Sequence, residues 1–134
     1  MKKNLWVFLL AIVMLLAAML ACSFSASTAN ITEAWMARDE AGEQKTDVFA
    51  QDEVFYCKVE LANAPDDTMV KASWTAVNVE GEEPNIFLDE TELTTGDNIL
   101  TFELSNNGLW PTGSYKVDVY LNGELDQTLA FEVR

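Results

Sequence analysis

Strict alternation of apolar and polar residues near the C-terminus constrains the fold of this chain most strongly. Two runs, 115–121 and 128–133, place an apolar residue at every second position. The apolar members are Tyr115, Val117, Val119, Leu121, Leu129, Phe131 and Val133. Because successive side chains of a strand point to opposite faces, each run has one apolar face that must be covered. The pattern predicts a β-hairpin packed against the rest of the domain.

The turn of this hairpin is signalled by the dipeptide Asn122-Gly123. A strict two-residue loop would place Lys116 opposite Leu129 and put the apolar residues of the two strands on opposite faces. A three-residue loop, with Gly123 left-handed in a bulge, avoids this conflict. We therefore predict the longer loop, which brings a set of apolar residues to one face. That set is Val117, Val119, Leu125 and Leu129.

Similar short runs recur along the chain and are separated by turn residues. The segment 31–37 is compatible with a strand, by its Ile and Trp, or with one helical turn, by its Ala, Met and Glu; we assign a strand because every later run is β. The predicted strands are 31–37, a short edge piece at 46–50, 55–61, 70–76, 86–93, 99–104, 115–121 and 129–133. Counting 31–37 as the first, we expect about seven main strands at intervals of roughly ten residues. This spacing predicts an all-β domain, an antiparallel sandwich or a small barrel.

Alternation within these runs also predicts the core. Three central runs each have one apolar face, which we expect to point inward. The inward residues are Phe55, Cys57, Val59 and Leu61, then Val70, Ala72, Trp74 and Ala76, and then Leu100, Phe102 and Leu104. Lys58 and Tyr56 fall on the outward side of their run.

The N-terminus has the pattern of an export signal. Lys2 and Lys3 precede an apolar run, 5–21, that is slightly long for a signal peptide and short for a spanning helix. Ala21-Cys22 then leads into small, polar residues. This segment resembles the lipobox of bacterial lipoproteins, although Met19 stands where leucine is usual. The resemblance implies that Cys22 receives diacylglycerol and becomes the new N-terminus.

The resulting division is a signal peptide at 1–21, a lipidated cysteine and flexible tether at 22–30, and the folded domain at 31–134. Two alternatives remain: cleavage by an ordinary signal peptidase after Ala29, which gives a secreted domain, and an uncleaved signal anchor. All three place the domain outside the cytoplasmic membrane, because the lysines hold the N-terminus inside.

The folded region, 31–134, resembles the immunoglobulin-like sandwiches of bacterial surface proteins. Cys57 and Trp74 lie inward on successive strands, and the segment 112–117 is similar to the tyrosine corner of that family, with Tyr115 as its tyrosine. The resemblance implies that the Tyr115 hydroxyl bonds to nearby backbone. Val117 stands where the second disulfide cysteine would be, so Cys57 is expected to be a buried free thiol.

Composition argues against several function classes. The chain of 134 residues has no histidine, which removes the commonest general base, metal ligand and pH switch. After the leader, 6 basic and 22 acidic residues remain, a formal charge of −16 that repels nucleic acid. We predict a non-enzymatic domain without a cofactor or a bound metal.

Two sets of residues are candidates for binding. Three acidic groups, at 66–67, 80–83 and 89–92, could offer oxygen ligands to Ca²⁺, but none follows the spacing of a calcium loop, and solvated surface is the simpler interpretation. Tyr56 and Tyr120 fall outward, and Trp110 lies in a loop, so these aromatics are possible ligand or partner contacts. Trp110 could instead fold back and plug one end of the sandwich.

The sequence thus predicts a non-enzymatic, immunoglobulin-like module, exported and held to the membrane by a lipid at Cys22. We expect a role in protein contacts or in envelope structure, with a protein partner in addition to the membrane. The alternative is an exported β-sandwich that binds a glycan or Ca²⁺.

Overall fold

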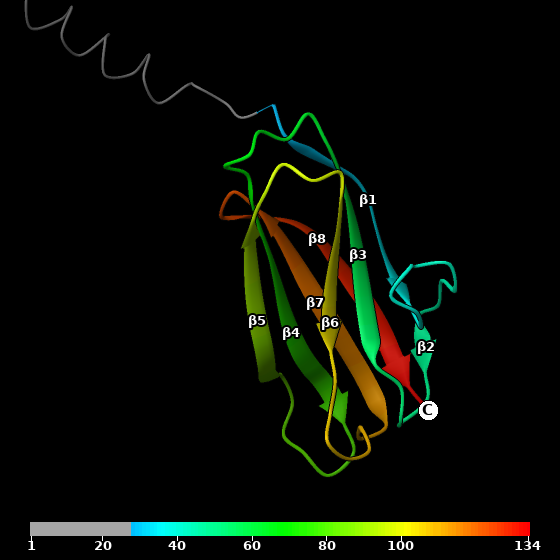
Figure 1. Ribbon diagram of the computed structural model, residues 1–134. Coiled ribbons are helices and arrows are strands. Elements are labelled where there is room, and N and C mark those ends of the chain that lie inside the picture. The colour runs from blue at the N-terminus through cyan, green and yellow to red at the C-terminus, as the bar shows by residue number, and fades with distance from the viewer. Residues whose placement is uncertain (1–27) are drawn as a thin grey trace, which may run out of the picture.

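The computed structural model describes residues 28–134, which form a sandwich of two β-sheets (Figure 1). The eight strands are β1 (Asn30–Ala37), β2 (Val48–Phe49), β3 (Phe55–Ala62), β4 (Met69–Val79), β5 (Ile86–Thr94), β6 (Ile99–Leu104), β7 (Gly113–Leu121) and β8 (Glu124–Val133). The all-β prediction is confirmed, and the segment 31–37 is a strand, not a helical turn. Within residues 28–134 no helix is long and apolar enough to cross a membrane.

The two sheets differ in width. One has three strands in the order β1-β3-β6, and the other has five in the order β2-β8-β7-β4-β5. All pairs are antiparallel except the short pair of β2 with β8. The predicted edge piece at 46–50 is therefore a strand of two residues, and it pairs in parallel because the chain has just crossed from the narrow sheet to the wide one.

The core lies between the sheets and follows the predicted alternation. All eleven residues that the central runs point inward are buried. An aromatic cluster surrounds Phe55, whose ring lies 4.6 Å from the ring of Trp110 and 4.8 Å from that of Phe131. Rings in stacked and edge-on contact at such distances stabilise beyond the apolar area they bury. Trp74 belongs to the same cluster, with its ring 6.3 Å from Phe55.

The tyrosine corner has the expected geometry. The Tyr115 ring is buried in the core at the start of β7, and its hydroxyl donates a 2.6 Å hydrogen bond to the carbonyl oxygen of Pro111. This bond closes the loop that carries the chain from the narrow sheet to the wide one.

The loop of the β7–β8 hairpin corrects the sequence prediction. Leu121 pairs with Glu124, so the turn has two residues, and both have positive φ, 49° at Asn122 and 85° at Gly123. These angles are those of a type I′ turn. The conflict of faces is resolved within β8, where a bulge shifts the register so that Val117 faces Leu129.

The same bulge changes the position of Leu125. Predicted to lie on the inner face, this residue pairs with Tyr120 on the outer face and is 56% exposed. The hairpin does contain one extra residue, as predicted, but this residue lies in β8 and not in the turn.

The two ends of the sandwich are distinct (Figure 1). At one end, here the proximal end, Thr28 donates a hydrogen bond of 2.9 Å to the carbonyl oxygen of Asn63, near the loops 63–68 and 95–98 and the β7–β8 turn. At the opposite, distal end lie the loops 50–54, 80–85 and 105–112 together with the C-terminus. The folded chain therefore enters at one end of the sandwich and finishes at the other.

Candidate functional site

Trp110 is a structural residue of the distal end. Its side chain is only 7% exposed, it stacks on Phe55, and its ring N–H donates to the carbonyl oxygen of Glu53 at 3.0 Å. Its backbone N–H donates to the carbonyl oxygen of Gln51, and the side-chain amide of Gln51 donates to the carbonyl oxygen of Trp110. These bonds and its burial agree with the alternative that Trp110 plugs the end of the sandwich, and they leave little of its ring exposed for a contact.

The other two predicted contact residues do not form one surface. Tyr56 lies on the outer face of the narrow sheet, and Tyr120 lies on the outer face of the wide sheet. Both are half-buried, and the ammonium group of Lys71 lies 4.4 Å from the centre of the Tyr120 ring. A continuous aromatic stripe that would hold a glycan is therefore not formed by these two tyrosines.

The three acidic groups also lie apart. The pair 66–67 lies in a loop at the proximal end, 80–83 lies at the distal end, and 89–92 runs along β5. In residues 28–134 no three Cys, Asp or Glu side chains come close enough to hold a metal ion. The third predicted site, Cys22, lies outside the described residues.

Cys57 is a buried free thiol between the sheets. Burial in the apolar core raises the pKa of its thiol to about 12. Because the thiolate is the nucleophile, a cysteine in this state is chemically inert at neutral pH and serves as a small apolar residue.

An apolar crevice opens at the distal end, between the wide sheet and the loop 105–112. It has a volume of about 290 Å³ and lies against Trp110 and Tyr115. The remaining lining residues are Ala76, Val79, Glu82, Ile86, Leu88, Asn106 and Pro111. Two of them, Ile86 and Leu88, belong to β5, so the crevice continues onto the edge of the wide sheet.

Two large hydrophobic side chains are exposed at the same end. Phe87, near the start of β5, is 62% exposed, and Leu109, in the loop between β6 and β7, is 66% exposed. Phe87 faces the outer side of the wide sheet, opposite Thr75, whereas Leu109 precedes the lining residue Trp110. Large exposed apolar residues gathered at one end of a domain are typical of protein contact surfaces. Neither residue was predicted as a contact from the sequence. Alternation in a strand and position in a loop do not show which side chains gather at one end of the sandwich.

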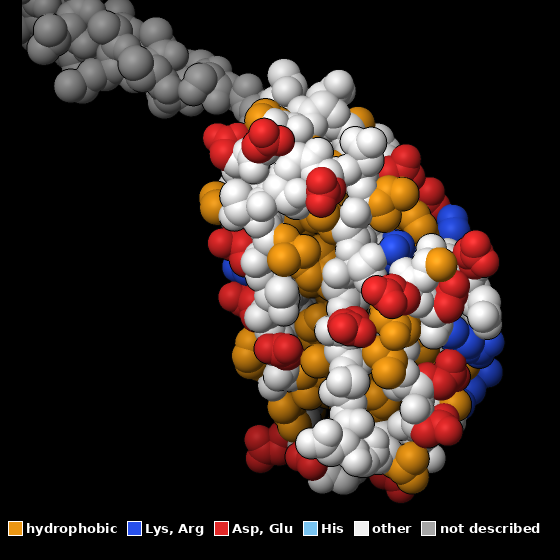
Figure 2. Space-filling view, in the orientation of Figure 1, with side chains coloured by type: hydrophobic (Ala, Val, Ile, Leu, Met, Phe, Trp, Pro, Cys, Tyr) orange, Lys and Arg blue, Asp and Glu red, His pale blue; other side chains and the backbone are white. Residues whose placement is uncertain are grey.

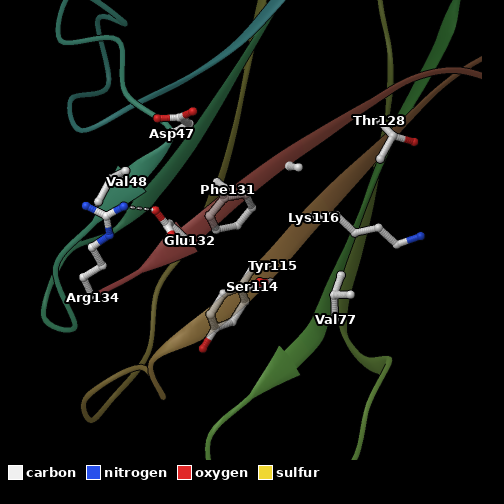
Figure 3. A pocket seen from close by; sticks show the side chains of 11 residues that line it. Asp47, Val48, Val77, Ser114, Tyr115, Lys116, Thr128, Phe131, Glu132 and Arg134 are labelled. Carbon is white, nitrogen blue, oxygen red and sulfur yellow. Dashed lines mark ion pairs between the residues drawn. The ribbon is translucent and has the colours of Figure 1, made fainter.

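A larger hollow lies on the outer face of the wide sheet (Figure 3). It has a volume of about 530 Å³ and is lined mainly by β7, β8 and the segment around β2. Arg134 and Glu132 form an ion pair of 2.5 Å at its margin, and Lys116 contributes a second cation. Lys116 is itself 3.2 Å from Asp118, so the cations of this hollow are already paired with carboxylates.

The burial of Lys58 on the narrow sheet was not predicted from the sequence. This residue points outward, as predicted, yet it is only 7% exposed because the loop 38–47 folds over it. Its ammonium donates to the carbonyl oxygen of Glu40 at 2.8 Å and to the hydroxyl of Thr101 at 2.5 Å. Gly42, with φ of 76°, lies directly against the lysine stem, where an added Cβ would be 2.8 Å from Cγ. Lys58 thus anchors the loop, and alternation alone could not reveal this cover.

No family model matches the chain, and no curated protein matches it. Similarity appears only among solved structures. A crystal structure of an immunoglobulin-like protein from Pseudomonas aeruginosa superposes with a TM-score of 0.54 at 16% sequence identity, over 82% of this chain and 99% of that chain. At this identity the likeness shows the fold alone, and the fold is an immunoglobulin-like β-sandwich.

Two further likenesses cover small parts of larger enzymes. One is an alkylpurine DNA glycosylase from Pseudomonas fluorescens, with a TM-score of 0.49, 19% identity, and coverage of 81% of this chain and 31% of that chain. The other is a β-glucosidase from Listeria innocua, with a TM-score of 0.49, 16% identity, and coverage of 82% and 17%. At these scores neither likeness carries an argument about activity.

Proposed function

We propose that this immunoglobulin-like sandwich is a non-enzymatic protein-contact module, exported and held at the membrane by a lipid on Cys22. The proposal joins the lipobox-like segment of the sequence to the arrangement of the folded region. The fold by itself implies no activity, so the argument depends on where the surfaces of the molecule lie.

The exposed apolar surface of the distal end is the observation that carries this proposal. Leu109 is exposed in the loop that covers the crevice of about 290 Å³, and Phe87 is exposed on the outer face of β5, between the lining residues Ile86 and Leu88. A crevice of this size, open to solvent and lined mainly by apolar residues, can accept an apolar side chain of a partner protein. Large apolar side chains that fill such pockets are the usual anchors of protein interfaces.

The position of a lipid anchor agrees with this use. Five residues lie between Cys22 and Thr28, and the six Cα-to-Cα steps that join them span at most about 20 Å. A lipid at Cys22 would therefore keep the proximal end close to the bilayer. A strand such as β7, with nine residues, is about 30 Å long, so the distal end would face away from the membrane and be free to meet a partner.

The surface charge supports a basic partner. The residues after the leader have a formal charge of −16, and acidic side chains are spread over the face seen in Figure 2. Complementary charge accelerates association and selects the partner more than it raises affinity. This field also disfavours nucleic acid and anionic headgroups as ligands.

The experiment places a photo-reactive amino acid at Leu109 in the full chain, expressed in cells that produce it naturally. The matched control places the same residue at Asp67, an exposed position at the proximal end. We expect a discrete protein adduct from position 109 and none from position 67. The absence of an adduct from both positions, or an adduct from position 67 alone, would overturn the proposal.

A further inference from the structure

We propose that the free edge of β5 accepts an extended, basic segment of a partner protein, which adds to the wide sheet as a further strand. This inference rests on the proposed function and specifies how the partner is held. It follows from three features of β5: its unpaired edge, its partly covered inner face and the charge of its outer face.

The first feature is the open edge. β5 is the last strand of the wide sheet, and among the described residues β4 is the only strand that pairs with it. A strand of nine residues at the edge of a sheet presents alternating N–H and C=O groups that a second extended chain can satisfy; in β5 the Glu90 N–H already donates to the Asp89 carboxylate at 2.8 Å. β5 contains no proline, which would have removed a donor from this edge.

The second feature is the overhang of β5 beyond the narrow sheet. Ile86, Leu88 and Leu93 pack against the core but are only partly buried, whereas the corresponding residues of β4 are fully covered. Hydrophobic side chains are visible at the surface between the positions of β5 and β6 (Figure 2). An added strand with apolar residues on its inner side would cover this surface and reach the crevice that Ile86 and Leu88 line.

The third feature is the charge of the outer face. In the register with β4, Glu90 faces Ser73 and Glu92 faces Lys71, so both glutamates lie outward. Glu90 forms an ion pair with Lys71 at 3.9 Å, and Glu92 forms none among the described residues. A neighbouring strand with lysine or arginine at alternate positions would place its cations opposite these carboxylates.

The same charges argue against pairing between two copies of the chain. Two β5 edges placed side by side would bring Glu90 and Glu92 against like charges, which destabilises a cross-strand pair. The edge is thus selective for a segment of opposite charge.

The test uses the full chain in detergent and a nine-residue peptide of alternating valine and lysine. Hydrogen exchange is followed by mass spectrometry with increasing peptide. At a peptide concentration about ten times Kd, exchange of β5 edge amides should slow roughly tenfold by mass action. A peptide with glutamate in place of lysine is the control and should leave β5 unchanged.

Paired variants locate the site. Glu90→Lys with Glu92→Lys should weaken peptide binding by roughly tenfold at low salt. Glu124→Lys with Asp126→Lys makes the same change of net charge at exposed positions on β8 and should have little effect. Equal weakening by both pairs, equal protection by the acidic peptide, or protection confined to other segments would overturn the inference.

A photo-reactive residue at Thr91 in cells separates this inference from the proposed function. An adduct from Thr91 that the two β5 lysine substitutions abolish supports both. An adduct from Leu109 without one from Thr91 overturns the β5 inference and leaves the proposed function intact. No adduct from either position overturns the proposed function.

Discussion

At the scale of single residues, hydrogen-bonded and buried side chains fix the loops of this sandwich to its core. Tyr115→Phe removes the bond to the carbonyl oxygen of Pro111 and leaves the ring in place. We expect the free energy of unfolding to fall by about 1 kcal/mol, measured as a lower urea midpoint. Tyr56→Phe is the matched control, because the Tyr56 hydroxyl has no hydrogen-bond partner among the described residues. Equal midpoints for the two variants would contradict the role of the corner.

The burial of Cys57 should make the free energy of unfolding depend on pH. The folded chain holds the thiol proton up to about pH 12, whereas an ordinary cysteine releases it near pH 9. Between these values the unfolded state binds fewer protons, so the free energy of unfolding falls as pH rises, by up to about 1.4 kcal/mol per pH unit. Cys57→Ala should lose about 2 kcal/mol less between pH 9 and pH 11 than the parent. Parallel pH profiles would show that this thiol does not titrate as its burial implies.

The inward residues of the central strands were predictable from the sequence, and the packing of loop residues was not. The inward positions of Cys57 and Trp74 follow from parity, because a strand leaves only two directions for a side chain. Trp110 has no such periodicity, and only the packed structure shows that its ring N–H reaches Glu53. The burial of Lys58 also depends on a loop that folds over the sheet, and the alternation of β3 gives no information about this loop.

At the scale of elements, the β7–β8 turn needs a left-handed residue. Gly123 has φ of 85° and open space around it, so its replacement tests backbone conformation alone. Gly123→Ala should destabilise the fold by about 1 kcal/mol. Gly108→Ala, also in open space but without a positive φ, should change the free energy of unfolding by less than about 0.5 kcal/mol. A neutral Gly123→Ala would argue for a different turn.

The loop 38–47 depends on its anchor at Lys58. Lys58→Met removes the bonds to Glu40 and Thr101 while preserving most of the stem. We expect faster hydrogen exchange in 38–47 with β3 and β6 still protected, because the strands keep their ladder bonds. Lys71→Met, on the outer face of the other sheet, is the control and should leave this loop unchanged. A loop that exchanges at the parental rate would contradict the anchoring role.

The strands of this fold were predictable because each is long enough to show alternation, but their exact register was not. The bulge in β8 illustrates the reason: the apolar pattern demands one extra residue somewhere between Val119 and Leu129, and several positions satisfy it equally. Packing of the two sheets selects among them. The exact length of β2 was not predictable either, because a strand of two residues is too short to show alternation.

At the scale of the whole molecule, the proposed role depends on two properties. The described chain begins at the end of the sandwich opposite to the exposed apolar residues, and the two sheets differ in width. Thr28 lies at the proximal end, and the exposed residues Phe87 and Leu109 lie at the distal end. The wide sheet overhangs the narrow one at β5. The sequence predicted the sandwich, but the candidate contact surface arises only when strands far apart in the chain are assembled, so alternation could not identify it.

The intact mass of the chain purified from bacterial membranes tests the central claim of a tethered module most directly. We predict a mature protein that begins at Cys22 and carries two or three acyl chains, the number that gives stable attachment to a bilayer. The Cys22→Ser variant, which has no acceptor thiol, should lack the acyl mass and partition into the aqueous phase. A parent chain that begins at Asn30, or one that carries no acyl group, would contradict the account.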